Sequence, residues 1–488
     1  MKYPSLLYTD GPSGRQINPD VFEDLKLDLL LSSNAIEAMR TLCRPEDIPV
    51  RQELFKALEN AETLDRLKIL SRGASQIRRL YEAYRAVRCD NERHYVYFNL
   101  VNAVIFFYEN AANINGTGFL LGRLRAFFEK QISSPFFKKL RNEAEELAPR
   151  SEKIRVNIFR MVGEQLYIRP EESTTIVSRL LKCASDLGLK NKPVENRDVS
   201  IRLNPRIINA LAGLHAEEFS AFKNFYDEYG GFFSDGILTY LPELNFCLEM
   251  SAIFKSVREA GIPICWPMES KEKKIDIKEL RDLSLLAKNV TNIVPNDILF
   301  NEEEPFFFLT GANGGGKTTY LRSVGIAVIL FLSGCPIPCE GAEIYPLDNV
   351  FTHFPRDERF EGEGRFADEE KRVNDILAVH GGNSLVLLNE TYSTTSEDLA
   401  VKLTIELAKT IYKSGSLGIY ITHQHGIGDT DIPFLSVIID QSMENRRTYK
   451  IARMRGASGS FARDILKKYS LTKEALAKRF LPKEVSDI

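Results

Sequence analysis

Apolar and polar positions follow helical spacing through most of the first third of the chain. Segments 20–31 and 51–70 place apolar residues at steps of three and four with charged residues between them, which predicts amphipathic helices. Segment 98–111 is richer in aromatic and aliphatic residues and predicts a buried helix. Residues 116–122 break the pattern, and a charged amphipathic helix is expected again at 124–147.

The middle of the chain has a different pattern. Residues 153–158 and 164–168 alternate apolar and polar positions, which is typical of strands. They predict a small inserted subdomain at about 150–205. Helical spacing returns at 205–261, with an interruption near Gly230.

From about residue 276 onward, short apolar runs are separated by helical stretches. The runs are bounded by turn residues and lie at 305–310, 384–389, 417–422 and 436–440. Such alternation of strands and helices indicates an α/β sheet domain. The predicted fold class is therefore mixed, with an α-helical domain followed by an α/β domain.

Composition narrows the class of protein. A chain of 488 residues is expected to form more than one domain. Hydrophobic residues make up 44% and charged residues 27%, as in soluble globular proteins, and the formal net charge is −3. Because the chain is not a polycation, any contact with nucleic acid must come from local basic surface.

Signals for secretion, membranes and metals are weak. The first residues lack a basic segment followed by an apolar one, so no secretory signal is expected. The longest apolar run, 324–332, is far short of the ~20 residues that span a bilayer and predicts a buried helix. The seven cysteines are scattered and only Cys335 and Cys339 lie close in sequence, so no zinc site is predicted. Buried thiols, no membrane partner and a cytoplasmic location are expected.

A glycine-rich loop carries the strongest chemical signal. An apolar run precedes it and an apolar helix follows, and it fits the P-loop pattern G-x-x-x-x-G-K-[ST]. Such glycines let successive backbone N–H groups point at phosphate oxygens beside a helix N-terminus. Lys317 would reach the β and γ phosphates of ATP, and Thr318 would hold Mg²⁺. The loop and helix start comprise Gly311, Ala312, Asn313, Gly314, Gly315, Gly316, Lys317, Thr318 and Thr319.

Acidic and histidine residues follow the next two predicted strands. Residues 384–388 lead into Asn389 and Glu390, as in a Walker B strand. Glu390 is a candidate general base for the attacking water. The expected Mg²⁺ site is Thr318, Asn389 and Glu390. Asn389 stands where an aspartate usually faces Mg²⁺, so weaker Mg²⁺ binding is expected rather than lost hydrolysis. His423 ends the following strand and is a candidate contact for the γ phosphate; a structural role is the alternative. His425 is expected to face solvent.

These motifs together resemble the ATPase domain of the MutS family, the ABC-type ATPases of DNA mismatch repair. Their order and spacing agree with the family through about 290–480. The resemblance implies two composite ATP sites in a homodimer. The motifs lie at 294–297, 310–322, 351–352, 384–390 and 422–423.

A further segment resembles the ABC-type signature. In the family, a serine at the start of this helix meets the γ phosphate of the opposite subunit. Gly364 falls at that position, with Arg365 beside it and Glu369 in the same segment. We therefore expect backbone N–H groups at 362–364, or Arg365, to replace the serine. A plain amphipathic helix is the alternative.

The resemblance extends to the rest of the chain, more loosely. Segments 44–55 and 246–267 resemble the start and the return of the MutS core or lever domain. Residues 150–205 would then be a reduced DNA clamp, and 458–462 resemble the helix-turn-helix tail of the family. The resulting domains are 1–275 for the core, 276–455 for the ABC-type ATPase and 456–488 for the dimerisation tail.

The mismatch-reading and connector domains of the family have no counterpart that we recognise in this sequence. Residues 107–109 and 127–129 match the Phe-x-Glu tripeptide of the mismatch wedge, but both lie in helical patterns. We interpret them as helix residues of the lever.

The functional expectation is an ATP-gated homodimeric clamp in the cytoplasm, associated with the nucleoid, that acts on mismatched or branched double-stranded DNA. Two alternatives stay open: a mechanical ATPase that acts on ribosomes or a protein complex, and a scaffold that binds ATP but scarcely hydrolyses it. Basic residues of the expected clamp could contact phosphates or form a solvated surface. They are Lys153, Arg155, Arg160, Arg169, Arg179, Lys182, Lys190 and Lys192.

Overall fold

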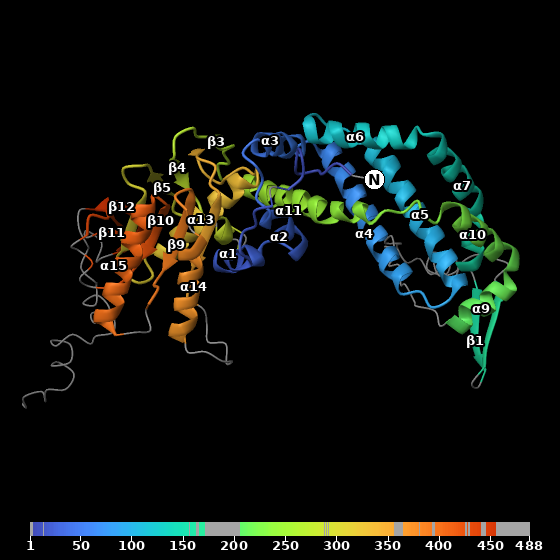
Figure 1. Ribbon diagram of the computed structural model, residues 1–488. Helices are drawn as coiled ribbons and strands as arrows, with labels where there is room; N and C mark the ends of the chain where they lie inside the picture. The colour runs from blue at the N-terminus through green and yellow to red at the C-terminus, as the bar shows by residue number, and fades with distance from the viewer. Residues whose placement is uncertain are drawn as a thin grey trace, which may run out of the picture. The chain divides into compact units, whose positions relative to one another are not determined.

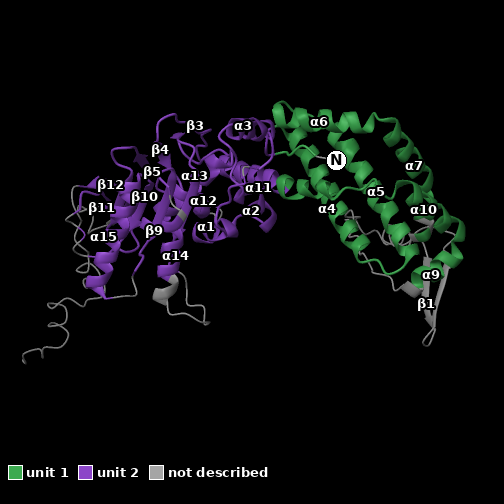
Figure 2. Cartoon of the chain, viewed as in Figure 1, with its two compact units in different colours: residues 1–6, 60–244 green, residues 7–59, 245–488 purple. Residues whose placement is uncertain are grey.

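The computed structural model describes residues 3–12, 14–155, 157–162, 165–170, 205–286, 288, 290, 292–355, 365–379, 381–392, 396–424, 427, 430–440 and 446–454. These residues fall into two compact units (Figure 2). Unit 1 lies within Met1–Leu6 and Asn60–Leu244, and unit 2 lies within Leu7–Glu59 and Asn245–Ile488. Segments from both ends of the described chain therefore pack together in unit 2. The predicted boundaries at 275 and 455 stay a prediction.

Unit 1 is built from long helices and one β-hairpin (Figure 1). Helix α4 begins where the Asn60 side chain accepts hydrogen bonds from the backbone N–H groups of Glu62 and Thr63. Aromatic side chains fill the core, and Phe98 and Phe128 are fully buried in it. The elements are α4 (Ala61–Arg85), α5 (Asp90–Ala112), α6 (Phe119–Ile132), α7 (Pro135–Arg155), β1 (Asn157–Val162), β2 (Gln165–Pro170), α9 (Pro205–Leu214), α10 (Ala216–Tyr229), η2 (Asp235–Thr239) and the start of α11 (Tyr240–Glu259).

The predicted buried helix at 98–111 is confirmed within α5. The strand predicted at 153–158 is wrong at its start, because residues 153–155 continue α7. Ser151 and Ile154 are both buried, and their spacing of three matches one face of a helix. The hairpin itself is present, since β1 and β2 pair antiparallel. Residues 171–204 of the expected clamp lie outside the described residues.

Unit 2 opens with short helices. The helix predicted at 20–31 is interrupted, because Lys26 adopts a left-handed conformation with φ of 62°. The helical segment predicted at 51–70 ends at Ala57 and restarts after Asn60. The elements are α1 (Pro19–Asp24), η1 (Leu27–Leu29), α2 (Ser33–Arg40), α3 (Asp47–Ala57) and the remainder of α11.

Two sheets form the body of unit 2. A four-stranded sheet has the order β3-β7-β4-β5, and a six-stranded sheet has the order β12-β11-β6-β10-β9-β8. In the larger sheet, every pair is parallel except β11 with β12. The strands are β3 (Met268–Glu269), β4 (Ile275–Leu280), β5 (Asn296–Phe300), β6 (Phe306–Thr310), β7 (Gly341–Ile344), β8 (Asn349–His353), β9 (Ser384–Asn389), β10 (Leu417–Ile421), β11 (Phe434–Asp440) and β12 (Arg446–Met454).

Helices cover both faces of the larger sheet. Side chains of α14 (Arg365–Val379) and α15 (Glu397–Ser414) join one core cluster with alternate residues of β6 and β9, including Phe308 and Leu388. Helix α13 (Lys317–Leu332) packs on the other face, where Gly325 lies against Leu387. A short helix, α12 (Leu283–Leu286), follows β4. The predicted α/β domain is thus confirmed, and so is the burial of 324–332.

Among the described helices, none combines the length and the apolar character that crossing a membrane requires. The predicted helix-turn-helix at 456–488 lies outside the described residues.

Candidate functional site

Three neighbouring parallel strands end at one edge of the six-stranded sheet. Strands β6, β10 and β9 lie side by side in that order. The glycine loop, residues 311–316, follows β6; Glu390 follows β9; and His423 comes two residues after β10. Because the carboxyl ends of parallel strands meet at the same edge, the sheet brings these three predicted features together.

The glycine loop has a backbone that other residues rarely adopt. Gly311, Gly314 and Gly316 have φ of 122°, 69° and 91°. A Cβ added at Gly315 would lie 3.0 Å from the carbonyl oxygen of Ala312, whose carbonyl also accepts a hydrogen bond from the Gly315 N–H. The loop leads directly into the N-terminus of α13, where unpaired N–H groups and the helix dipole favour an anion.

Lys317 is the first residue of α13, and its side chain turns back across the loop. Its Nζ donates to the carbonyl oxygens of Gly311, at 2.8 Å, and Ala312, at 3.1 Å. The residue is only 5% exposed. A buried ammonium group is thus held at the loop, where it would attract an incoming phosphate.

Glu390 and His423 form a close pair at the same edge. The Glu390 Oε1 and His423 Nε2 atoms lie 3.1 Å apart, and the Glu390 N–H donates to the carbonyl oxygen of Ile421 at 2.9 Å. The His423 imidazole lowers the pKa of the Glu390 carboxyl, against the effect of burial, and the Lys317 ammonium lowers it further. Glu390 also has a positive φ of 53°, which is unusual for this residue type. The carboxylate is therefore ionised at neutral pH and can accept a proton.

Asn389 precedes Glu390 and offers an unused acceptor. The residue is 7% exposed, and its Oδ1 has no hydrogen-bond partner among the described residues. Such an oxygen fits a water molecule bound to Mg²⁺, and the Thr318 hydroxyl and the Glu390 carboxylate are further oxygen groups at the site. In the described part of the chain, no group of three His, Cys, Asp or Glu residues could hold a metal alone. A Mg²⁺ ion here would rely on phosphate oxygens and water.

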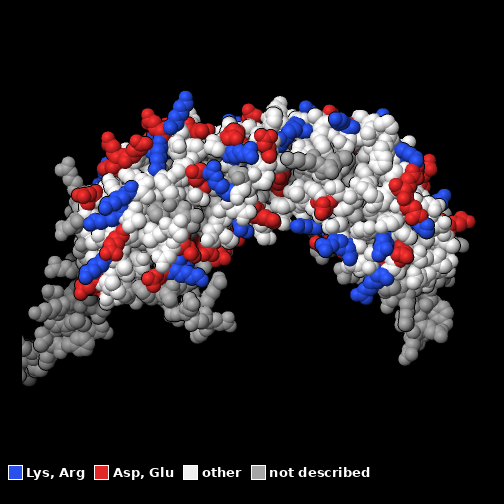
Figure 3. Space-filling view, viewed as in Figure 1, with Lys and Arg blue, Asp and Glu red and all other residues white. Residues whose placement is uncertain are grey.

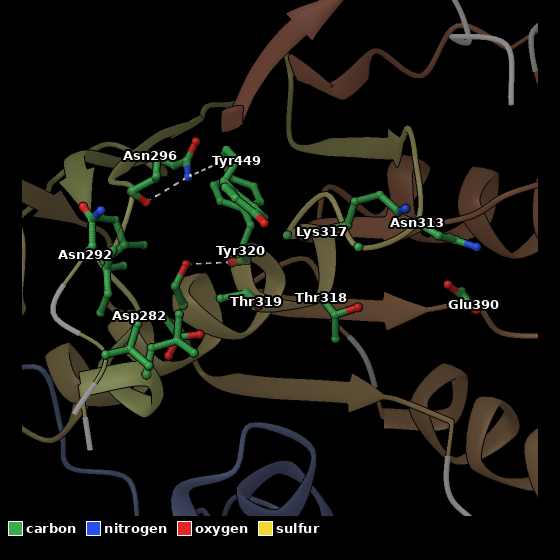
Figure 4. Close-up of a pocket in the computed structure, with 18 residues that line it drawn as sticks. Asp282, Asn292, Asn296, Asn313, Lys317, Thr318, Thr319, Tyr320, Glu390 and Tyr449 are labelled. Carbon is green, nitrogen blue, oxygen red and sulfur yellow. Dashed lines mark hydrogen bonds between the residues drawn. The ribbon is translucent and has the colours of Figure 1, made fainter. Parts of the chain in front are cut away.

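A pocket of about 670 Å³ extends from Lys317 and Glu390 along the side of α13 (Figure 4). Its lining also includes Asn292, Ile293, Val294 and Tyr449, and Asn292 and Tyr449 lie away from Glu390 (Figure 4). Pockets of this size accept small-molecule ligands of nucleotide dimensions. The resemblance to the MutS family implies adenine near 292–295, and residues 292–294 of that segment line the pocket.

Tyr449 reaches the pocket through an irregular pairing of β11 and β12. Residues 448–450 of β12 face the single residue Ile438 of β11, and Tyr449 has a φ of 58°. The Asn296 side chain fixes this bulge, because its Nδ2 donates to the Tyr449 carbonyl oxygen at 3.1 Å and its Oδ1 accepts from the Ile451 N–H at 2.7 Å. The ring thereby lies beside Gly316.

Asp282 contributes a buried carboxyl group to the same pocket. It is 3% exposed, and its Oδ1 accepts a hydrogen bond from the Ser284 N–H at 2.7 Å. Burial raises its pKa, while hydrogen bonds from Ser284 oppose this effect. Sequence reasoning missed Asp282 and Tyr449, because neither belongs to a recognisable motif.

Comparison with known proteins identifies the family. Residues 307–454 match a family model described as MutS domain V, and the matching relatives bear the names MutS and MSH. The chain belongs to the MutS family. The matched segment contains the glycine loop, the Glu390–His423 pair and Tyr449.

MutS-family relatives align with part of this chain. The DNA mismatch repair protein MutS of Chlorobium limicola is 29% identical over 184 residues, which are 33% of this chain and 21% of that protein. The DNA mismatch repair protein MSH6 of Saccharomyces cerevisiae is 28% identical over 249 residues, 46% of this chain and 20% of the relative. The mitochondrial DNA mismatch repair protein MSH1 of Arabidopsis thaliana is 34% identical over 125 residues, 25% of this chain and 11% of the relative. The chain therefore matches about a fifth or less of each relative's length.

The residues that resemble a MutS-family trans signature are only partly described. Gly364 lies outside the described residues. Arg365 begins α14, and Glu369 is 5% exposed on this helix. His425 also lies outside the described residues. The contact with an opposite subunit stays a prediction.

Proposed function

We propose that this MutS-family chain binds ATP with Mg²⁺ in the pocket beside α13 and hydrolyses it. The convergence of the glycine loop, Lys317 and the Glu390–His423 pair at one edge of the sheet carries this proposal. The pocket of about 670 Å³ extends past Lys317 to Asn292 and Tyr449, which supports ATP over an isolated phosphate.

The residues of the site suggest a direct mechanism. Loop N–H groups and Lys317 would hold the β and γ phosphates, and Lys317 would exchange its two carbonyl partners for phosphate oxygens. Thr318 and Asn389 would hold Mg²⁺, which neutralises charge on the phosphates when bound. Water attacks the γ phosphorus as its proton passes to Glu390 Oε, and the bond to the bridging β–γ oxygen breaks to release ADP.

His423 would act on this step through Glu390. Its ring lies 3.1 Å from the carboxylate and keeps that group ionised before water is bound. The same position could let the imidazole contact the γ phosphate. Its side chain is 32% exposed, so it can move toward a ligand.

Nucleotide binding and turnover of three variants test the site. Lys317→Ala should lose both ATP binding and hydrolysis, whereas Glu390→Gln should still bind ATP and lose turnover about 100-fold or more. Lys409→Ala removes an exposed lysine of α15 and should match the wild type. Wild-type turnover in Lys317→Ala would refute the assignment. Binding without turnover in the wild-type chain would instead support the nucleotide-gated scaffold.

For the target, we propose mismatched or branched duplex DNA and a homodimeric working form. The support is the family and the names of the relatives, which are DNA mismatch repair proteins. On the face seen in Figure 3, basic and acidic side chains are interspersed over the described residues of both units. DNA would therefore be held by a local basic surface, and the expected clamp at 150–205 is the candidate.

Binding to homoduplex, mismatched and four-way-junction DNA at two salt concentrations tests the target. Affinity should fall steeply with salt, because phosphate contacts release counterions. Stimulation of ATP hydrolysis by one of the three DNAs would identify the preferred structure. Absence of DNA binding at low salt, together with copurification with ribosomal subunits, would favour the mechanical ATPase.

Subunit pairing has its own test. Sedimentation with and without ATP should show a dimer that ATP stabilises. Arg365→Ala should reduce turnover if this residue replaces the family serine, and an unchanged rate would leave that role to the backbone at 362–364.

A further inference from the structure

Two cysteine thiols meet within unit 2, although 74 positions separate them in sequence. Cys265, between α11 and β3, forms an isolated antiparallel bridge with Ile337, in which each N–H donates to the other's carbonyl oxygen at 2.9 Å. Cys339 turns back toward this bridge, since its N–H donates to the Ile337 carbonyl oxygen at 2.9 Å. The Cys339 thiol then donates a hydrogen bond to the Cys265 sulfur.

The two thiols differ in exposure and in acidity. Cys339 is 1% exposed, whereas Cys265 is partly exposed to solvent. The hydrogen bond from Cys339 lowers the pKa of Cys265 to about 7, and it raises the pKa of Cys339. The lowered pKa favours the thiolate form of Cys265, and the thiolate is the form that reacts with oxidants.

Other buried cysteines nearby lack this arrangement. Burial raises the pKa of Cys43 and of Cys335, which are both buried in the same unit. They stay protonated and shielded, so the pair of Cys265 with Cys339 stands apart from its neighbours.

We propose that Cys265 and Cys339 form a redox site that a hydroperoxide oxidises to a disulfide. The Cys265 thiolate attacks the peroxide, the O–O bond breaks, and the departing oxygen takes a proton while Cys265 becomes a sulfenic acid. The Cys339 sulfur then attacks Cys265, its proton leaves with the hydroxyl as water, and the S–S bond forms. Two electrons pass from the two thiols to one hydroperoxide.

The disulfide would act on the wall of the pocket. The carbonyl oxygen of Pro338 accepts a hydrogen bond from the Arg281 N–H at 3.0 Å. The Glu340 N–H donates to the carbonyl oxygen of Lys278, also at 3.0 Å. Leu280 and Asp282, which flank Arg281, line the pocket. Hydrogen-bonded sulfurs lie well beyond the ~2.05 Å of an S–S bond, so closure pulls residues 338–340 toward Cys265.

This displacement should weaken nucleotide binding. Movement of residues 338–340 would stretch the two hydrogen bonds that join them to the end of β4. Leu280 and Asp282 would then shift, and the shape of the pocket would change. This part of the inference rests on the proposed ATP site, whereas disulfide formation does not.

Peptide mapping of the full-length chain tests the disulfide. After treatment with equimolar hydrogen peroxide and blocking of free thiols, mass spectrometry should find the Cys265 peptide joined to the Cys339 peptide, and dithiothreitol should reverse the link. Preferential oxidation of Cys89, a partly exposed cysteine of unit 1, or pairing of Cys265 with another cysteine would overturn the proposal. This experiment uses the wild-type chain and needs no variant to fold.

Variants assign the two roles. Cys339→Ser should leave Cys265 as a sulfenic acid that a cyclic diketone reagent traps, and Cys265→Ser should protect Cys339 from oxidation. Cys89→Ser should leave the link intact. Trapping of a sulfenic acid at Cys339 in Cys265→Ser would contradict the assigned order of attack.

Binding of a fluorescent ATP analogue to the reduced and oxidised chain tests the coupling. The dissociation constant should rise threefold or more on oxidation and return on reduction, and it should not change in Cys265→Ser. Equal affinities in both states would overturn the coupling. Failure of the reduced chain to bind the analogue would instead refute the proposed ATP site, and the mapped disulfide would still stand.

Discussion

Asp24 and Arg372 form a buried ion pair that joins α1 to α14, although 348 positions separate them in sequence. The Arg372 Nη2 donates to Asp24 Oδ2 at 2.9 Å, and the two side chains are 13% and 3% exposed. Thr352 Oγ1 donates to the same oxygen at 2.7 Å, and Arg322 Nε donates to the Asp24 backbone carbonyl at 2.9 Å. Asp24 thus connects α1 with both α13 and α14.

Asp24→Asn should destabilise unit 2, because it leaves the buried Arg372 guanidinium with only the more distant carboxylate of Asp20, whose Oδ2 lies 3.8 Å from Arg372 Nε. Breaking such a pair costs about 3 kcal/mol, whereas an exposed pair contributes about 1 kcal/mol or less. The Arg15–Asp348 pair, with side chains 52% and 45% exposed, supplies the control through Asp348→Asn. Urea unfolding followed by tryptophan fluorescence would measure both variants. Equal midpoints would show that the buried pair contributes no more than the exposed one.

The pair of Glu390 with His423 predicts a pH profile. Because His423 lowers the pKa of Glu390, the carboxylate should stay ionised below the ordinary glutamate value of about 4.3. In His423→Gln the largest lowering contribution is lost, and burial then raises the pKa. The acidic limb of the ATP hydrolysis rate should therefore move to higher pH.

Rates measured from pH 4 to 8 would test this shift in the wild type and in His423→Gln. Glu397→Gln, which changes an exposed acid at the start of α15, should leave the acidic limb in place. Superimposable limbs in the wild type and His423→Gln would show that His423 does not set the ionisation of Glu390.

The site could be predicted from sequence as far as its features are local. Strand β6, the glycine loop and α13 are continuous in the chain, so an apolar run, a glycine pattern and a buried helix identify them together. Glu390 and His423 each follow an apolar run directly, and parallel pairing then brings the strand ends to one edge. Continuous buried strands of this kind are the easiest to recognise.

Features that depend on pairing or on a single dihedral angle could not be predicted. The ring of Tyr449 enters the pocket because a bulge in β12 shifts which side chains point to each face of the strand. The pattern of apolar and polar residues along the sequence does not reveal this bulge. The left-handed Lys26 divides a segment whose apolar spacing fits one helix. The Asp24–Arg372 pair brings together residues that no local pattern connects.

Asn389→Asp should strengthen Mg²⁺ binding. Its side-chain oxygen is buried and lacks a hydrogen-bond partner among the described residues, so an aspartate there would present its charge to a metal-bound water. Hydrogen bonds to charged groups exceed neutral ones by about 1 kcal/mol, which corresponds to roughly fivefold tighter binding.

The Mg²⁺ concentration for half-maximal ATP hydrolysis would measure this effect. In the presence of ATP, removal of Mg²⁺ leaves the same variant with a buried charge that lacks a partner, so chelation should lower its melting temperature more than that of the wild type. Asn374→Asp, on the exposed side of α14, should respond to chelation as the wild type does. An unchanged Mg²⁺ requirement in Asn389→Asp would show that Asn389 is not part of the metal site.

Tyr449→Ala should weaken ATP binding about tenfold, since stacking of an aromatic ring on a base contributes about 1–3 kcal/mol. Tyr449→Phe keeps the ring and should bind nearly as the wild type does. Titration with ATP and with inorganic triphosphate distinguishes the contribution of the base from that of the phosphates. In Tyr449→Ala, the affinity for ATP should fall and the affinity for triphosphate should not change. Equal losses for both ligands would mean that Tyr449 supports the glycine loop, which its ring contacts at Gly316, rather than the base.

Gly418 tests how far the site depends on close packing of its strands. A Cβ at this position of β10 would overlap the carbonyl oxygen of Val386 in β9 and lie 2.9 Å from the Phe306 ring in β6. Gly418→Ala should therefore destabilise unit 2 by about 3 kcal/mol, because a backbone atom cannot move aside without breaking the pairing. The β10–β9 pairing also sets Ile421 opposite Asn389, so ATP hydrolysis should fall even where the variant stays folded.

Gly122→Ala, in helix α6 where a Cβ would meet no atom within 4 Å, should be neutral or stabilising by about 0.5–1 kcal/mol. Thermal unfolding and turnover of the two variants side by side would separate this local clash from a general effect of replacing glycine.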